Sequence, residues 1–157
     1  FELVHKNMHK ARQNNGGEGP QAEELQSLAA DLPVTFTGYL SGAALVRAYE
    51  QADIFVFPST TDTYGKVVLE AQAAGLAVVV SGQGGPRENV VPGKSGIVVR
   101  QETAEAYASA MLALASDPPM LLGMKREARC YAESRSSEKA FAAQWKLIET
   151  LTPQACW

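Results

Sequence analysis

Two carboxylates bracket the start of a predicted helix. Asp62 precedes the helix and Glu70 lies in its second turn, within the stretch STTDTYGKVVLEAQAAG at residues 59–75. An ionised carboxylate only accepts hydrogen bonds, so each of these side chains suits a pair of hydroxyl groups. A helix that only packs against a core needs neither acid. The simpler alternative is a turn-forming Asp62 and a solvated Glu70.

The same helix start is a candidate phosphate site. We expect the backbone amides of Gly65, Lys66 and Val67 to lack intrahelical acceptors and to lie at the positive end of the helix dipole. Gly65 has no side chain to shield this backbone, and Lys66 either adds a positive charge or is solvated. A diphosphate at this position, with a carboxylate on each side of it, predicts a nucleotide-sugar ligand.

Strands and helices alternate around this stretch and must position it. Short apolar runs, each typical of a strand buried on both faces, alternate with helical stretches between residues 33 and 100. This alternation predicts βαβ units in an α/β fold, with a doubly wound, Rossmann-like parallel sheet and helices on both faces. The strands are expected at 34–38, 53–58, 76–80 and 96–99, and the helices at 41–52 and from Gly65 onward.

Residues at the helix ends support this division. Ser41 is a predicted N-cap, Pro20 a predicted first helical residue, and Gly75 a predicted left-handed residue after a helix. After Arg100 the pattern becomes helical, and the apolar spacing of the last helix predicts that it docks onto another surface. These C-terminal helices are predicted at 103–117, 118–134 and 137–151.

The first sixteen residues have a weaker pattern. FELV is typical of a short strand, HKNMHKARQ of a polar helix and NNGG of a linker. His5 and His9 would share one face of a helix, but no third metal ligand lies near them in the sequence, so solvated histidines are the favoured interpretation. We therefore divide the chain into an unassigned segment at 1–16, a domain at 17–151 and a tail at 152–157.

Composition excludes several classes of protein. The chain has 157 residues, enough for one domain, and a net charge of -3, which gives no basic face for nucleic acid. No apolar run is long enough to span a bilayer and no secretory signal opens the chain. Cys130 and Cys156 are expected to be free thiols. Because residue 1 is Phe, we expect the chain to be part of a longer protein.

The region from Ala52 to Val99 resembles a known enzyme family. The stretch ADIFVFPSTTDTYGKVVLEAQAAGLAVVVSGQGGPRENVVPGKSGIVV is similar to the C-terminal, donor-binding half of family 4 (group 1) retaining glycosyltransferases, which have the GT-B fold. That family has two acids with seven residues between them, in the form E-x-F-G-x-x-x-x-E-A, followed by a small-residue strand and a G-G-x-x-E turn. The likeness covers about residues 16 to 150 and rests on these motifs in combination.

The resemblance implies a role for each matching residue. Glu70 matches the acid that holds the ribose hydroxyls, and Asp62 stands at the first acid, which contacts the transferred sugar. Thr63 lies beside it, and Tyr64 and Gly65 match the aromatic–glycine pair that faces the sugar and the diphosphate. The base-contacting loop corresponds to Tyr39 and Leu40.

Two departures from the family pattern stand out. The first acid is Asp62 rather than glutamate, so its carboxylate reaches about one methylene less far. The family also opens this half with a strand ending in Gly-Arg and a following lysine that clamp the diphosphate, and nothing in residues 1–15 matches that pattern. The later turn matches at Gly84, Gly85 and Glu88, for which a structural role is the first expectation.

The resemblance implies transfer of a hexose from a nucleotide-diphosphate sugar to a hydroxyl acceptor, with retention. We expect helix-terminal amides and basic side chains to stabilise the leaving diphosphate without a metal or another cofactor. The acceptor-binding N-terminal half is missing from this sequence, so we expect the chain alone to be inactive. Expected partners are the nucleotide-sugar donor and that missing domain, but not nucleic acid. The expected location is the cytoplasm, with peripheral association at the inner face of a membrane.

Two alternatives remain open from the sequence. A non-catalytic Rossmann-like module, retained to bind a partner or to stabilise an assembly, is favoured by the shorter acid and the unmatched Arg/Lys pair. A nicotinamide-binding domain is disfavoured, because SGQGGPREN follows a late strand and does not supply G-x-G-x-x-G in the first strand–helix turn. The sequence does not specify the base among UDP, GDP and ADP, the sugar or the acceptor.

Overall fold

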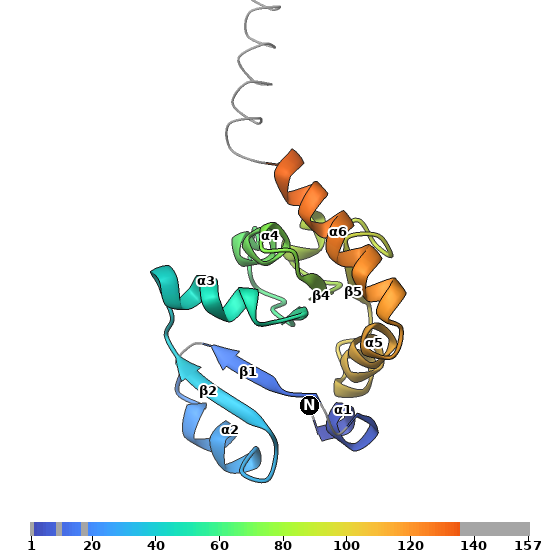
Figure 1. Cartoon of the computed structure of the whole chain (residues 1–157). Helices are drawn as coiled ribbons and strands as arrows, with labels where there is room; N and C mark the ends of the chain where they lie inside the picture. The colour runs from blue at the N-terminus through green and yellow to red at the C-terminus, as the bar shows by residue number, and fades with distance from the viewer. Residues whose placement is uncertain (1, 9–10, 17–18, 136–157) are drawn as a thin grey trace, which may run out of the picture.

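The computed structural model describes residues 2–8, 11–16 and 19–135 of the chain, and the statements below concern these residues. Helices and strands alternate through most of this length (Figure 1). Their order is α1 (Glu2–Asn7), β1 (Gln13–Gly16), α2 (Ala22–Leu28), β2 (Val34–Gly38), α3 (Gly42–Glu50), β3 (Ile54–Phe57), α4 (Lys66–Ala73), β4 (Ala77–Ser81), the 3-10 helix η1 (Pro86–Asn89), β5 (Gly96–Val99), α5 (Ala104–Ser116) and α6 (Pro118–Ser134).

All the strand pairs of the described residues are parallel, which confirms the predicted α/β fold. The strands form two sheets rather than a single one: β1 pairs with β2, and β3, β4 and β5 form a second sheet in that order. Within the larger sheet, Val79 of the central strand is level with Val56 on one side and Ile97 on the other. The four strands predicted between residues 33 and 100 are all present.

The core lies on both faces of β4, which is buried along its whole length. Val78 and Val80 point to one face, where they pack with Val68 of α4 and Leu76. The alternate residues of the strand point to the other face, toward α5 and α6. Full burial of a valine or leucine side chain contributes about 1.5–3 kcal/mol, so this strand anchors the loops at its carboxyl end. The residues of the second cluster are Ala77, Val79, Val99, Leu114 and Met124.

The N-terminal segment differs from its predicted structure. The segment predicted as a short strand is helix α1, because Val4 is buried and the helix packs against α5. The predicted linker is in part strand β1, because its backbone pairs with β2 and the Gln13 amide donates to the Pro33 carbonyl at 3.1 Å. Tertiary pairing overrides the low strand propensity of the sequence QNNG in this position.

The helix-end predictions have mixed outcomes. Gly75 has φ 82°, the predicted left-handed conformation, and Ser41 is the N-cap residue of α3, although its side chain makes no capping hydrogen bond. Pro20 is not the first residue of α2, which begins at Ala22. The two helices after Arg100 are confirmed as α5 and α6, and the third, predicted at 137–151, lies outside the described residues.

Candidate functional site

The loop between β3 and α4 is organised around the Asp62 carboxylate. Its Oδ1 atom accepts hydrogen bonds from the backbone amides of Tyr64 at 2.9 Å and Gly65 at 2.5 Å. The Asp62 amide in turn donates to Ser59 Oγ at 3.2 Å. Asp62 therefore shapes the loop through local hydrogen bonds, and no described residue donates a hydrogen bond to its other carboxylate oxygen.

Helix α4 begins at a glycine that no other residue replaces easily. Gly65 is its N-cap residue and has φ 72°, a left-handed conformation that favours glycine. A Cβ atom at this position would lie 2.7 Å from the Cα of Pro86, so the turn after β4 packs directly against the helix start. The expectation that the Gly65 amide is unpaired is wrong, because Asp62 accepts its hydrogen.

The next two amides remain open. In the part of the chain that the structure describes, no group accepts a hydrogen bond from the amides of Lys66 and Val67. The first hydrogen bond of the helix runs from the Val68 amide to the Gly65 carbonyl, at 3.0 Å. These two N–H groups lie at the positive end of the α4 dipole. Tyr64 stands beside them with 61% of its surface exposed. This end of α4 is a place where an anion would find donors without a cationic side chain.

The glycine pair after β4 supports the loop rather than lining open space. The Gly85 amide donates to the Asp62 carbonyl at 2.9 Å, and a Cβ atom on Gly85 would lie 2.0 Å from the carbonyl oxygen of Thr63. A Cβ atom on Gly84 would meet the Thr60 and Asp62 carbonyl oxygens at 3.0 Å. The close approach of these two loops therefore requires glycine at both positions, as the structural interpretation of Gly84 and Gly85 predicts.

The short helix η1 also contacts the loop that precedes α4. Asn89 is buried, and its side-chain amide donates to the Tyr64 carbonyl. Glu88, the acid of the matched turn, is exposed, and its backbone amide donates to the Gly85 carbonyl at 2.9 Å. The Tyr131 hydroxyl of α6 donates to the Glu88 carbonyl at 3.1 Å. These contacts tie η1 to α6 and hold the loop before α4 in place.

Glu70 lies one turn after the open amides, on the same helix face as Lys66. Lys66 Nζ is 3.7 Å from Glu70 Oε1, and the lysine side chain is 80% exposed against 39% for the glutamate. Burial, followed by the charge of Glu70, raises the pKa of Tyr49 on α3. The Glu70 carboxylate is therefore half-buried on the side of α4 that faces α3, rather than fully solvated.

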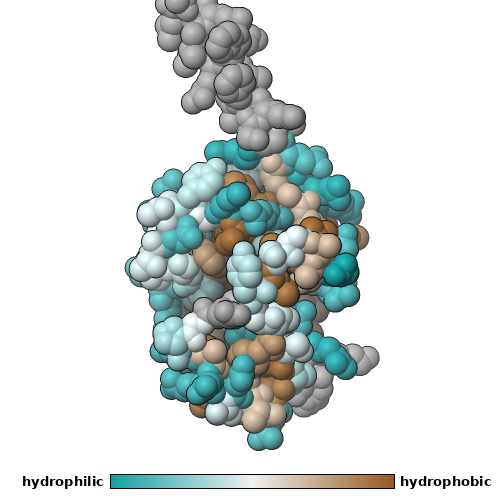
Figure 2. Space-filling model, turned by 90° about the vertical axis from the view of Figure 1, so that its left-hand side faces the viewer, coloured by the Kyte–Doolittle hydropathy of each residue, from teal (hydrophilic) through white to brown (hydrophobic). Residues whose placement is uncertain are grey.

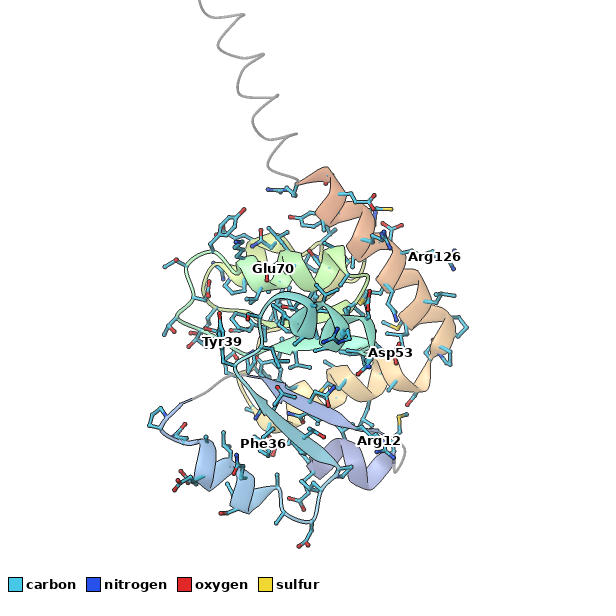
Figure 3. The ribbon with its side chains drawn as sticks, turned by 60° about the vertical axis from the view of Figure 1, so that its left-hand side comes forward. Arg12, Phe36, Tyr39, Asp53, Glu70 and Arg126 are labelled. Carbon is cyan, nitrogen blue, oxygen red and sulfur yellow. The ribbon has the colours of Figure 1, made fainter. Side chains whose placement is uncertain are left out.

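Tyr39 and Leu40 lie in the loop after β2, immediately before α3. Tyr39 is 75% exposed, and both residues line the same cavity as Tyr49 and Val67. Figure 3 shows Tyr39 in the loop after β2 and Glu70 on helix α4. The loops after β3 and β4 contact each other, and the loop after β2 lines the cavity that Val67 of α4 also lines.

Comparison with known proteins shows the family. Residues 1–117 match the family described as "Glycosyl transferases group 1". The chain belongs to this family. It is 33% identical over 138 residues to the sulfoquinovosyl transferase SQD2 of Arabidopsis thaliana, covering 85% of this chain and 25% of that protein. It is 34% identical over 144 residues to the D-inositol 3-phosphate glycosyltransferase of Corynebacterium jeikeium, covering 89% of this chain and 34% of that protein.

The fold of this group 1 family member also matches solved structures. The pneumococcal O-GlcNAc transferase GtfA, solved in complex with UDP and GlcNAc, superposes with a TM-score of 0.78 at 18% identity. The match covers 94% of this chain and 31% of that one. At this identity the likeness concerns the fold. The chain spans between a quarter and about a third of the length of these curated relatives.

A polar cluster that sequence reasoning missed closes the carboxyl ends of β4 and β5 in this group 1 domain. Glu102 Oε1 accepts hydrogen bonds from Ser81 Oγ at 2.7 Å and from the Gly82 amide at 3.1 Å, while Oε2 accepts one from the Tyr107 hydroxyl at 2.7 Å. These bonds, that of Tyr107 first, lower the pKa of Glu102. Burial and the carboxylate raise the pKa of Tyr107 to about 12. Glu102 lies in the loop between β5 and α5, and its place shortly after a predicted strand is the sequence feature that indicates it.

Other predicted features concern metals, thiols and membranes. Among the described residues no group of three or more His, Cys, Asp and Glu side chains is placed to hold a metal ion. The described part of the chain contains no helix long and apolar enough to cross a membrane. Cys130 is an exposed free thiol. The side chains of His5 and His9, and Cys156, lie outside the described residues.

Proposed function

We propose that this chain is the donor-binding, C-terminal half of a retaining group 1 glycosyltransferase. The full enzyme transfers a hexose from a nucleotide-diphosphate sugar to a hydroxyl acceptor. Membership of the group 1 family supports the reaction class, and the UDP and GlcNAc bound to GtfA support the class of donor. The donor half and the stereochemistry rest on the motif of two acids that brackets α4.

The observation that carries the proposal is the open helix start. The Lys66 and Val67 amides point out of α4 with no acceptor in the described structure, beneath an exposed Tyr64 and one turn before Glu70. A diphosphate accepting these two hydrogen bonds gains charge-assisted contacts, and Lys66 Nζ adds a cation next to them. The negative charge that develops on the leaving diphosphate is stabilised by the same donors.

The contacts to the ribose, the base and the sugar are assigned to the groups around the start of α4. Glu70 accepts hydrogen bonds from the ribose hydroxyls, and the loop at Tyr39 and Leu40 contacts the base. The sugar lies against the loop that Asp62 shapes, where the free Asp62 oxygen accepts a hydroxyl hydrogen. Thr63 and Tyr64, both exposed in that loop, complete the sugar contacts.

Turnover requires a second half. A GT-B active site lies between two domains, and this chain supplies the donor side, so the acceptor-binding domain chooses the hydroxyl that is attacked. We expect the chain alone to bind donor without transferring it. Peripheral association with a membrane face then belongs to the full enzyme.

One observation favours the alternative of a non-catalytic module. One carboxylate oxygen of Asp62 accepts hydrogen bonds from two amides of its own loop, so this carboxylate has a structural role that requires no ligand. A module kept for its fold would retain these hydrogen bonds and lose nucleotide affinity. The open amides of α4 and the half-buried Glu70 favour the donor-binding proposal, because neither contributes to these hydrogen bonds.

Calorimetric titration separates these possibilities. The chain is titrated with UDP, GDP, ADP and NAD, and the proposal expects one nucleoside diphosphate to bind with a measurable enthalpy. Binding of NAD with no response to any diphosphate indicates a dinucleotide domain. No response to any of the four indicates the non-catalytic module. Lys66→Ala is the companion variant, and it should weaken the diphosphate that binds by a few-fold, the effect of removing one exposed charge.

A further inference from the structure

One peptide group before α4 is held from both of its sides. The carbonyl of Tyr64 accepts a hydrogen bond from the side-chain amide of Asn89. The N–H at the other end of the same peptide group belongs to Gly65 and donates to Asp62 Oδ1 at 2.5 Å. Gly65 directly precedes Lys66, the first residue of the helix. Because a peptide group is planar, these two hydrogen bonds together fix the direction in which the backbone enters α4.

The glycine at this position makes such a restraint necessary. Gly65 has φ 72°, and a glycine enters and leaves this conformation without the steric barrier that a Cβ atom imposes. The peptide group between Tyr64 and Gly65 therefore rotates at little cost unless other groups hold it. A rotation would also redirect the next two amides, those of Lys66 and Val67, because their positions follow from the backbone angles of Gly65.

The support for Asn89 is the short helix η1, which Asn89 ends. The first residue of η1 is Pro86, which packs against Gly65, so η1 touches the loop before α4 at both of its ends. The Tyr131 hydroxyl holds η1 on α6 through the Glu88 carbonyl, at 3.1 Å. Asn89 is thus anchored outside the loop whose backbone it holds.

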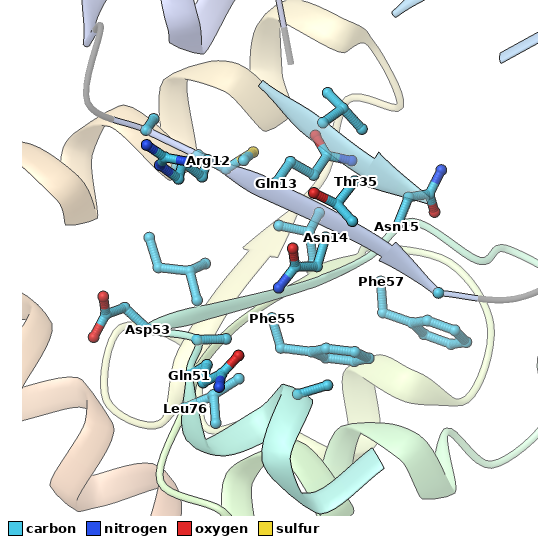
Figure 4. Close-up of a pocket in the computed structure, with 18 of the residues that line it drawn as sticks. Arg12, Gln13, Asn14, Asn15, Thr35, Gln51, Asp53, Phe55, Phe57 and Leu76 are labelled. Carbon is cyan, nitrogen blue, oxygen red and sulfur yellow. The ribbon is translucent and has the colours of Figure 1, made fainter. Parts of the chain in front are cut away.

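Asn89 affects the start of α4 without lining the space in front of it. The cavity beside this helix start, part of which Figure 4 shows, is lined by Val67, Tyr39 and Leu40, and Asn89 is not among the described residues that line it. With 4% of its surface exposed, Asn89 also forms almost none of the molecular surface, one side of which Figure 2 shows. A ligand that approaches from the cavity or from the surface therefore meets the amides and not Asn89.

We propose that Asn89 is a positioning residue for phosphate binding, which holds the Tyr64 carbonyl and thereby keeps the amides of Lys66 and Val67 directed at one anion. The inference rests on the proposed function, since it requires a diphosphate at the start of α4. Without Asn89, the peptide group is held from the Asp62 side only. Phosphate affinity should then fall, because donors that must first be ordered bind more weakly than donors that are already in place.

Four variants and two kinds of ligand test this inference by calorimetry. The ligands are UDP, GDP and ADP on one hand and inorganic pyrophosphate, which has no ribose or base, on the other. Asn89→Leu puts an apolar group of similar size in place of the amide, and Asn89→Ser has a side chain too short to reach the Tyr64 carbonyl. Glu70→Gln is the reference for a ribose contact. Asp117→Ala is the stability control, since it removes the remote cap of α6 that accepts the Met120 amide at 2.9 Å.

The inference expects both Asn89 variants to bind the preferred nucleoside diphosphate and pyrophosphate about three- to tenfold more weakly, the effect of one neutral hydrogen bond. Glu70→Gln should weaken the nucleotide alone. Asp117→Ala should lose stability in urea and keep both affinities. In the free Asn89→Leu protein, the NMR shifts of the Lys66 and Val67 amides should differ from wild type, and pyrophosphate should change them less.

Four results would overturn the inference and leave the proposed function in place. The first is equal affinity of wild type and the Asn89 variants for every ligand that binds. The second is a loss of affinity in Asp117→Ala as large as in Asn89→Leu, which assigns the effect to global stability. The third is an effect on the nucleotide without one on pyrophosphate, including a wild type that does not bind pyrophosphate. The fourth is loss of the fold in both Asn89 variants, which makes Asn89 a core residue.

Two other outcomes are read differently. A wild type that binds neither pyrophosphate nor any of the three nucleoside diphosphates overturns the proposed function, and this inference with it. If Asn89→Leu alone fails to fold by circular dichroism, Asn89→Ser takes its place with the same expected order of affinities, and unchanged affinities in Asn89→Ser then overturn the inference.

Discussion

Asp62 Oδ1 lies 2.5 Å from the Gly65 amide and accepts its hydrogen, so the first acid of the motif holds the residue that directly precedes the helix of the second acid. The same oxygen also accepts the Tyr64 amide hydrogen at 2.9 Å. Asp62 therefore shapes the loop that leads into α4, and α4 carries Glu70. A change at Asp62 is expected to act on stability and on binding, and a change at Glu70 on binding alone.

The first prediction concerns these loop hydrogen bonds. Asp62→Ala should lower the free energy of unfolding by about 1 kcal/mol, because the amides of Tyr64 and Gly65 lose their acceptor. For a chain of this size that corresponds to a fall of about 2–4 °C in the thermal midpoint. Asp62→Asn is the matched control, because its side-chain oxygen still accepts both amides and should keep most of the stability. Equal stability of all three proteins in urea unfolding would show that these hydrogen bonds contribute nothing.

The second prediction concerns the contact between the two loops. Gly85→Ala should destabilise the domain by more than about 2 kcal/mol, since its Cβ would lie 2.0 Å from the Thr63 carbonyl oxygen and force the backbone to move. Gly123→Ala is the control, because a Cβ there meets nothing within 4 Å and replaces a helical glycine, which should stabilise α6 by up to about 1 kcal/mol. Urea midpoints of both variants give the comparison. A tolerated Gly85→Ala would contradict the described loop packing.

The third prediction concerns alkaline pH. The pKa of Tyr107 is raised from 10.0 to about 12 in the folded protein, by burial first and by Glu102 second. The folded state therefore holds this proton more tightly than the unfolded state does. The resulting stability is fully present below pH 10 and is lost as the pH rises toward 12.

Removing the hydroxyl isolates this contribution. The difference in free energy of unfolding between wild type and Tyr107→Phe should shrink as the pH is raised through that window. Glu102→Gln should show a smaller alkaline loss than wild type, because one cause of the raised pKa is gone. The measurement is urea unfolding across the pH range. A difference between wild type and Tyr107→Phe that stays constant with pH would count against the Glu102–Tyr107 hydrogen bond.

Part of this structure could be predicted from the sequence. The strands from Val34 to Val99 are predictable because each is a short run rich in β-branched or aromatic residues, which favour strands. The candidate site is predictable to the same extent, since the loops after parallel strands meet at one edge whatever their side chains are.

The rest depends on partners that are distant in sequence. Strand β1 has the composition of a turn and is a strand only because β2 pairs with it. The use of Asp62 as an acceptor for its own loop amides depends on a loop conformation that the Gly85 and Asn89 contacts impose, and no spacing rule predicts these contacts. Glu102 was missed for the same reason, because its partners Ser81 and Tyr107 lie on either side of it in different elements.

The central claim is that Glu70 accepts hydrogen bonds from the ribose of a nucleotide bound at the start of α4. Hydrogen bonds to a charged acceptor contribute about 1.5–3 kcal/mol each, so Glu70→Gln should weaken binding of the preferred nucleoside diphosphate by about tenfold or more. Stability should change little, because the exposed Lys66–Glu70 pair contributes about 0.5 kcal/mol or less. Glu133→Gln is the matched control, since it breaks an exposed pair of the same i, i+4 spacing on α6.

The most direct measurement is a calorimetric cycle with that nucleotide and its 2′-deoxy form. We predict that wild type and Glu133→Gln bind the deoxy form more weakly than the ribose form, and that Glu70→Gln loses most of this preference together with its affinity. Equal affinities of wild type and Glu70→Gln for a nucleotide that binds, with the same ribose preference in both, would contradict the assignment of Glu70 to the ribose.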